Sequence, residues 1–225
     1  MPLGPRSPLL PCAIPSPTAT AFSAYHWRHR RIPVRIFSCS RHPCPPHVRK
    51  ENAVNPSPIA FSTCDFCDEH KSAPPQQEFR VLPPVFHSYG GRSRFYGPVR
   101  TVKCHEDNSP VKAAVESPGH GAVLVVDGGA SLRRALVGGN LAAAAERNGW
   151  AGLVVDGCVR DLAELQAASV GIRALGLIPL PTNRTTPGQT DVPVLIQGVP
   201  VVPGDWLYAD EDGIVISRQP LHAAG

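Results

Sequence analysis

The sequence predicts an α/β domain joined to an antiparallel β layer. Apolar runs at 122–127 and 153–156 are short and uninterrupted, which is typical of strands covered on both faces. Stretches with a helical pattern lie between and after these runs, as in a parallel βαβ unit. Two turn-centred apolar segments near the C-terminus predict the antiparallel part. Residues 59–225 form this domain, which is long enough for a sizeable core.

The first elements are each marked by local chemistry. Residues 62–70 look like a short helix start, and residues 95–104 like a strand interrupted at a Gly-Pro pair. Residues 107–110 (DNSP) combine a capping side chain with a proline in the first turn, so a helix over 111–116 is expected. The buried strand 122–127 follows, and we expect the glycine pair after it to end it.

The next four elements complete the parallel unit. An Ala-rich helix is expected over 141–148, and Gly149 suits its left-handed C-terminal position. A buried strand at 153–156, a helix at 162–168 and a strand at 172–178 follow. The order strand–helix–strand–helix–strand implies right-handed crossovers.

Beyond residue 190 the pattern changes to short strands. Residues 192–202 predict two strands about Gln197-Gly198, and residues 206–217 predict two more about a turn at 211–213. The chain has no Gly-x-Gly-x-x-Gly after a strand and no Walker A sequence, so a nucleotide-binding fold has no support.

The first 58 residues have a different composition. They hold 12 of the 26 prolines, and eight basic residues against one acid give them a charge of +7, which leaves −3 for the remainder. An Arg-rich, nearly acid-free segment is typical of an organelle transit peptide, so import into a plastid or a mitochondrion is expected. A disordered extension of a cytoplasmic protein, an upstream start site and a nucleic-acid or nuclear-import patch are the alternatives. The basic excess is confined to this segment, so nucleic-acid binding by the domain is not expected. The sequence contains no run of 18 apolar residues, so a membrane-spanning helix is not expected either.

The seven cysteines do not form the dense framework of a small secreted domain. Cys64 and Cys67, with His70 after them, could be half of a zinc site or a redox pair, but no second half follows. We expect buried, reduced thiols.

Two segments could carry chemistry. A glycine turn at 137–141 (VGGNL) opens a helix, and free N–H groups at a helix start can bind an anion. The alternative is that the glycines only make a loop. The second segment, 157–161, follows a buried strand, where ligands of α/β sheets bind. Arg160 could grip a carboxylate with two hydrogen bonds, and Asp161 could bind a hard cation such as Mg²⁺. The alternative is a capping aspartate beside a surface ion pair.

The domain resembles the RraA-like family, which includes 4-hydroxy-4-methyl-2-oxoglutarate aldolases and the bacterial regulator of ribonuclease E activity. The similarity covers residues 59 to about 217, and the plant members look closest. The stretches that carry it are CDEH (67–70), VLPPVFHSYGGRSRFYGPVRTVKCHEDN (81–108), VLVVDGGASLRRALVGGNLA (123–142), NGWAGLVVDGCVRD (148–161) and PGDWLYADEDGIVIS (203–217).

This resemblance implies a swivelling β/β/α fold and a homotrimer with its active site at the subunit interface. It places substrate binding on Gly138, Gly139, Asn140 and Leu141 and on Arg160, and metal binding on Asp161, with Mg²⁺ first and Mn²⁺ or Co²⁺ as substitutes. The implied activity is a metal-dependent lyase that cleaves 4-hydroxy-4-methyl-2-oxoglutarate to two pyruvates and decarboxylates oxaloacetate. The alternative is a non-catalytic regulator of a ribonuclease.

One position departs from the family pattern. Bacterial aldolases that the chain resembles usually carry an acidic residue where this chain has Gly139. Retro-aldol cleavage needs a base for the hydroxyl proton and decarboxylation does not, so we expect decarboxylation to tolerate the glycine better. The substitute acids that the sequence offers without ranking them are Asp127, Asp156, Asp210 and Asp212.

Overall fold

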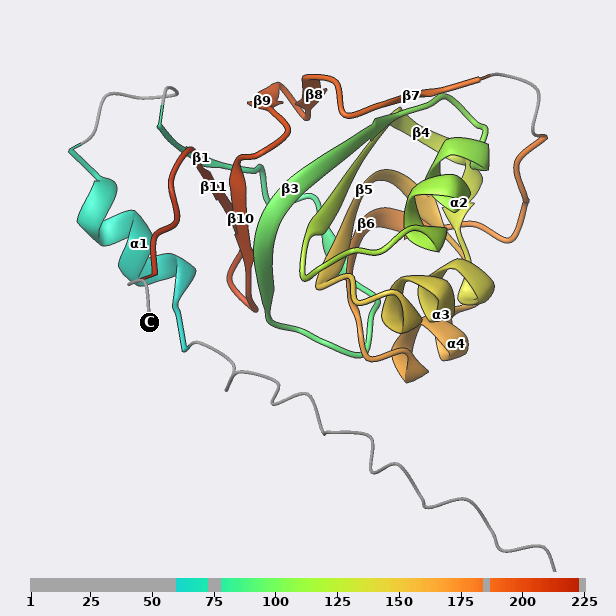
Figure 1. Ribbon diagram of the computed structural model, residues 1–225, viewed down its shortest axis with the longest axis horizontal. Coiled ribbons are helices and arrows are strands. Elements are labelled where there is room, and N and C mark those ends of the chain that lie inside the picture. The colour runs from blue at the N-terminus through green and yellow to red at the C-terminus, as the bar shows by residue number, and fades with distance from the viewer. Residues whose placement is uncertain (1–59, 73–77, 184–186, 223–225) are drawn as a thin grey trace, which may run out of the picture. The chain divides into compact units, whose positions relative to one another are not determined.

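A computed structural model describes residues 60–72, 78–183 and 187–222 (Figure 1). Its centre is a parallel sheet in which four strands lie side by side in the order β3-β4-β5-β6. The strands are β3 (Phe95–Lys103), β4 (Val123–Val137), β5 (Gly152–Val159) and β6 (Gly171–Leu177). The predicted parallel α/β unit is confirmed, and β3 joins it as a fourth parallel strand that the sequence pattern did not indicate.

Three helices connect these strands and cover one face of the sheet (Figure 1). They are α2 (Ser109–Glu116), α3 (Gly139–Arg147) and α4 (Leu162–Ala167). Gly149 has φ +74° after α3, as its predicted role requires. Val111, Leu124, Leu153 and Leu165 are among the buried side chains that join helices and sheet.

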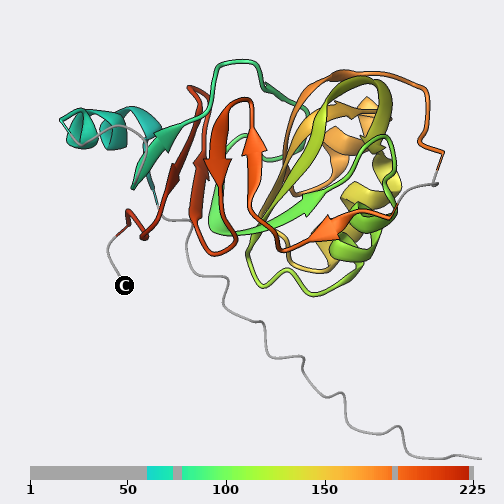
Figure 2. The same cartoon turned by 90° about the horizontal axis from the view of Figure 1, so that it is seen from above.

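Short antiparallel strands continue the same sheet beyond β3 (Figure 2). β10 (Trp206–Ala209) pairs with the first half of β3, then come β11 (Ile214–Ser217) and β1 (Phe79–Val81). β2 (His87–Ser88) borders β6, β7 (Gln189–Thr190) pairs with β3, and β8 (Val194–Ile196) forms a hairpin with β9 (Val199–Val201). Both predicted C-terminal hairpins are therefore present.

Apolar side chains of these strands and of hairpin β8–β9 pack on the sheet face opposite the helices. Val125, Val154, Ile196, Leu207 and Ile216 belong to this second core. The domain therefore has a β/β/α arrangement of layers. A third, aromatic cluster joins Phe61 and Phe66, from before and within α1 (Thr63–His70), to Tyr208.

Two strand boundaries differ from the expectation. The predicted Gly-Pro break is absent, because β3 runs through Gly97 and Pro98, which pair with β10, before its second half pairs with β4. The glycine pair does not end β4 either. The strand continues to Val137 through irregular pairing, with Gly129 and Ala130 at positive φ.

The expectation of buried thiols is wrong for Cys64. Cys64 is exposed because it lies on the outer side of α1, and Cys67 is half-buried. Both are free thiols whose pKa is raised, Cys64 chiefly by the charge of Asp212 and Cys67 by desolvation. The predicted N-terminal extension, residues 1–58, lies outside the described residues. No helix of the described part is long and apolar enough to span a membrane.

Candidate active site

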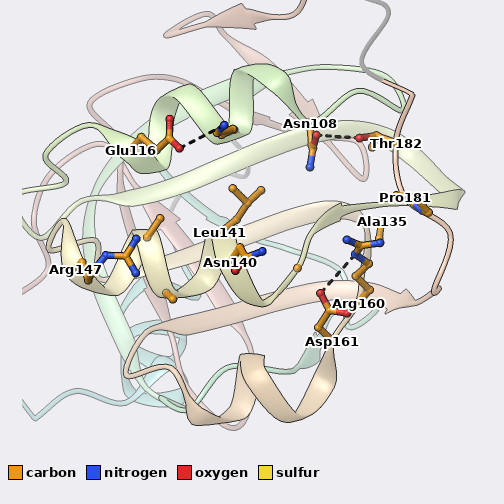
Figure 3. A pocket seen from close by; sticks show the side chains of 14 residues that line it. Asn108, Glu116, Ala135, Asn140, Leu141, Arg147, Arg160, Asp161, Pro181 and Thr182 are labelled. Carbon is orange, nitrogen blue, oxygen red and sulfur yellow. Dashed lines mark hydrogen bonds and ion pairs between the residues drawn. The ribbon is translucent and has the colours of Figure 1, made fainter. Parts of the chain in front are cut away.

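A cavity of about 410 Å³ lies between α2, α3 and the turn from β5 into α4 (Figure 3). Polar side chains stand at both ends of it, and small or apolar residues of α3 form the wall between them. The residues that line it include Lys112, Glu116, Ala135, Gly138, Asn140, Leu141, Arg147, Arg160 and Asp161.

The sheet register brings the two predicted segments together. Val137 at the end of β4 pairs with Val159 at the end of β5. The residues that follow, Gly138 and Arg160, therefore leave neighbouring strands at the same edge. The Arg160 N–H donates to the Val137 carbonyl at 3.0 Å, which fixes the second segment beside the first.

Asp161 has an unusual backbone conformation. Its φ of +64° and ψ of 49° lie in the left-handed region, and its side chain makes no capping hydrogen bond to α4. This conformation costs an ordinary residue about 1 kcal/mol, although aspartate tolerates it better than most. The side chain instead points back to α3, where Oδ2 accepts the Gly139 N–H at 3.2 Å.

Arg160 and Asp161 also form an ion pair. Arg160 Nε lies 3.4 Å from Asp161 Oδ2, and each side chain is 39% exposed. Because solvent screens a pair this accessible, it holds the two groups only loosely. No other partner is found for the guanidinium among the described residues, so its two terminal nitrogens can take an incoming carboxylate.

The glycine turn makes room for these side chains. A Cβ atom built on Gly138 would lie 2.6 Å from Asp161 Oδ2 and 3.2 Å from Arg160 Nε. The Gly138 carbonyl accepts from the N–H groups of Leu141 and Ala142, which starts α3. One expectation is thereby changed: the Gly139 N–H is bonded to Asp161, so an incoming anion must compete for it.

The structure thus brings all six predicted site residues to one place within a single chain. Five of them line the cavity, and Gly139 contributes its backbone N–H to Asp161.

The family assignment follows from comparison with known proteins. The RraA-like family model, described as Aldolase/RraA, matches residues 63–216. The chain belongs to the RraA-like family. A relative from Albidiferax ferrireducens named "putative 4-hydroxy-4-methyl-2-oxoglutarate aldolase" is 63% identical over 170 residues, which cover 72% of this chain and 98% of the relative.

Two solved structures share this RraA-like fold. One, the RNA-processing inhibitor RraA from Thermus thermophilis, has a TM-score of 0.68 and 44% identity, over 74% of this chain and 98% of that chain. The other, named S-adenosylmethionine: 2-dimethylmenaquinone methyltransferase from Geobacillus kaustophilus, has a TM-score of 0.67 and 40% identity, over 73% and 99%. Since the three names differ over one fold, function has to be inferred from the site.

The site suits a hard, mostly hydrated cation. The described residues contain no cluster of three or more His, Cys, Asp or Glu that could enclose a metal. Asp161 Oδ1 has no hydrogen bond within the described part of the chain, and the side chain lies on the cavity wall. Mg²⁺ commonly uses one or two protein carboxylates and keeps several waters, so this donor set fits it.

None of the four substitute acids lines the cavity. Asp127 and Asp156 lie on the sheet face that packs against hairpin β8–β9, where Gln197 Nε2 donates to Asp156 Oδ1 at 2.6 Å. Desolvation raises the pKa of Asp156. Asp210 and Asp212 belong to the turn between β10 and β11. The sequence could not rank these acids, because their distances from the glycine turn depend on which sheet face holds Asp127 and Asp156 and on where the β10–β11 turn lies.

Three charged cavity residues were missed in the sequence. Lys112 and Glu116 lie one helical turn apart on α2 and approach to 3.7 Å, and Arg147 lies in the last turn of α3. The i,i+4 spacing of Lys112 and Glu116 was a visible signal for one helix face. The packing of α2 against α3, which turns that face to the cavity, was not visible.

Proposed function

We propose that this chain is a divalent-metal-dependent lyase that breaks a C–C bond in small 2-oxo acids. The substrates are 4-hydroxy-4-methyl-2-oxoglutarate, which gives two pyruvates, and oxaloacetate, which gives pyruvate and CO₂. The observation that carries the proposal is the convergence of Arg160, Asp161 and the glycine turn on one cavity. The name of the Albidiferax ferrireducens relative supports the first substrate.

Arg160 is the group that holds the substrate carboxylate. Its planar guanidinium can donate two parallel hydrogen bonds, which fixes the direction of the 2-oxo acid as well as its position. Its backbone is tied to the end of β4, so the side chain starts from a rigid point. Asn140 and Leu141 form the adjoining wall and limit the room around the substrate.

Asp161 is the group that holds the cation, with Mg²⁺ first and Mn²⁺ or Co²⁺ as substitutes. A bound divalent ion supplies Lewis-acid stabilisation of the negative charge that develops on the 2-oxo group when the C–C bond breaks. Asp161 is held toward α3 by the Gly139 N–H at 3.2 Å, so the carboxylate is positioned before any ligand arrives.

The two reactions make different demands on the cavity. Retro-aldol cleavage requires an acceptor for the 4-hydroxyl proton, whereas decarboxylation does not. The only acids among the lining residues are Asp161 and Glu116, and Glu116 is paired with Lys112. We therefore expect oxaloacetate decarboxylation to be the faster reaction.

The assembly that we propose is a homotrimer with this cavity at the subunit interface. Leu132, Leu177 and Leu180 are 47–56% exposed, and the Leu180 carbonyl accepts the N–H of Ala135, which lines the cavity. Apolar surface beside the cavity is what a neighbouring subunit would cover.

Pyruvate release by the full-length chain tests the proposal. Each substrate is supplied with Mg²⁺, and a matched sample contains a chelator. Metal-dependent pyruvate from either substrate supports the lyase, and more from oxaloacetate supports the ranking. Efficient aldol cleavage with weak decarboxylation would reverse the ranking, and no pyruvate from either would reject the activity.

A second candidate is a protein-binding regulator of a ribonuclease. The 44% identity to the RNA-processing inhibitor RraA from Thermus thermophilis favours it. Such a role uses an outer surface and needs neither Arg160 nor Asp161. Binding of an endonuclease by a chain that releases no pyruvate, and equally by an Asp161→Asn variant, would favour the regulator.

Organelle import is proposed for the Arg-rich segment 1–58. A fluorescent protein fused to this segment should enter a plastid or mitochondrion, and a diffuse cytosolic signal would contradict import.

A further inference from the structure

The side chain of Glu164 is exposed to solvent and also lies against the start of α3. It lies in the first turn of α4, and its N–H donates to the Asp161 carbonyl at 2.9 Å. A Cβ atom built on Gly139 would lie 2.6 Å from both Cβ and Cδ of Glu164 and would overlap its carboxylate. The side chain therefore fills the space that any other residue at 139 would occupy.

Two carboxylates consequently meet at Gly139. Asp161 Oδ2 accepts its N–H at 3.2 Å, and the Glu164 carboxylate lies against its α carbon. Arg160 pairs with Asp161, but the carboxylate of Glu164 has no ion pair or hydrogen bond within the described residues. Two solvent-accessible carboxylates therefore lie at Gly139, and only the Asp161 carboxylate is paired with a guanidinium.

We propose that Glu164 is a second carboxylate of the divalent-cation site, acting together with Asp161. The inference rests on the metal-dependent function proposed above and adds a residue to its site. Mg²⁺ is usually held by one or two carboxylates and retains waters, which need acceptors around them. Glu164 supplies charge and acceptor oxygens to the ion or to its waters.

This inference also explains Gly139. Gly139 is not among the residues with positive φ, so its conformation does not require glycine. While Glu164 keeps this conformation, only glycine leaves room for it, because the Glu164 side chain occupies the position of a Cβ atom at 139. The other acid near the cavity, Glu116, has its own partner in Lys112 at 3.7 Å and lies on α2.

Binding of Mn²⁺ to the full-length protein tests the proposal without any substrate. The free ion is followed by electron paramagnetic resonance during a titration. Glu164→Gln should raise the Mn²⁺ dissociation constant about tenfold or more, the usual effect of losing a residue that supports a metal ligand. The matched control is Glu146→Gln on α3, about 10 Å along the helix from Gly139, which should change nothing.

Gly139→Ala supplies an independent arm, since it keeps both carboxylates and displaces only Glu164. It should weaken Mn²⁺ binding as Glu164→Gln does, and the double variant should be no weaker than the worse single one. Thermal melts followed by circular dichroism establish that each variant is folded, and if Gly139→Ala does not fold, Glu164→Gln decides alone.

The outcomes separate this inference from the proposed function. Wild-type Mn²⁺ affinity in Glu164→Gln overturns the role of Glu164. If Asp161→Asn loses the ion in that case, the cation site itself stands. If Asp161→Asn also binds Mn²⁺ like the wild type, the cation site is wrong, and the metal-dependent function fails with it.

Discussion

At the scale of single residues, Arg160 and Asp161 have unlike roles in the cavity. Both side chains are 39% exposed and 3.4 Å apart, so their mutual attraction is weak in water. The ion pair therefore contributes little to stability. Asp161 even accepts a left-handed backbone in order to direct its carboxylate at α3.

Replacing Arg160 should affect substrate binding. Arg160→Lys keeps the charge and loses the planar pair of donors, so we expect KM for oxaloacetate to rise roughly tenfold to a hundredfold, the equivalent of one charge-assisted hydrogen bond. Arg92→Lys, at an exposed arginine that does not line the cavity, is the control and should leave KM near the wild-type value. Equal KM values for Arg160→Lys and the wild type would exclude the carboxylate role.

Replacing Asp161 should separate charge from backbone strain. Asparagine tolerates the left-handed region, so Asp161→Asn should remove metal-dependent activity with little change in the free energy of unfolding. Asp161→Ala should remove the activity too and cost about 1 kcal/mol of stability in addition. Urea denaturation of the three proteins measures the difference. An alanine variant as stable as the asparagine variant would show that the strain is not real.

At the scale of elements, the two site segments could be predicted for different reasons. Residues 157–161 follow a buried strand, where ligands of α/β sheets bind, and residues 137–141 form a glycine turn that opens a helix. The parallel pairing of β4 with β5 is what brings both segments to the same edge of the sheet. Strand ends were harder, since the irregular pairing of β4 keeps the strand intact beyond its glycine pair. Glu164 could not be found from sequence, because its place against Gly139 depends on how α4 packs on α3.

The buried sheet face makes a prediction about pH. Desolvation raises the folded-state pKa of Asp156 above its value in the unfolded chain, and the charge of Asp127 adds to it. The contribution of Asp156 to stability is therefore present at low pH and lost as pH rises through the raised pKa. Asp156→Asn retains the oxygen that accepts from Gln197 and cannot ionise.

Unfolding free energies at about pH 4 and about pH 7 test this. Relative to the wild type, Asp156→Asn should gain stability at the higher pH and show a weaker decline between the two. Asp68→Asn, on the exposed side of α1, should follow the wild type. A variant with the wild-type decline would mean that Asp156 does not carry the pH dependence.

At the scale of the whole molecule, the fold class and the family are established, and the assembly is the next question. Three chains of 24.0 kDa would give a particle of 72 kDa. Sedimentation equilibrium of the purified chain should show that mass, and Leu132→Asp with Leu177→Asp should shift it toward the single chain. A wild-type protein that remains a single chain at all concentrations would exclude the proposed trimer.

Mg²⁺-dependent turnover compared between two proteins addresses the central idea most directly. Pyruvate formed from oxaloacetate is followed with the full-length wild type and with Asp161→Asn, each with added Mg²⁺ and with chelator. We predict that the wild type releases pyruvate with Mg²⁺ and that the chelator abolishes this release. With the variant, we predict only the background rate of pyruvate formation that free Mg²⁺ gives without enzyme. Equal, chelator-sensitive turnover by both proteins above that background would contradict the assignment of the cavity.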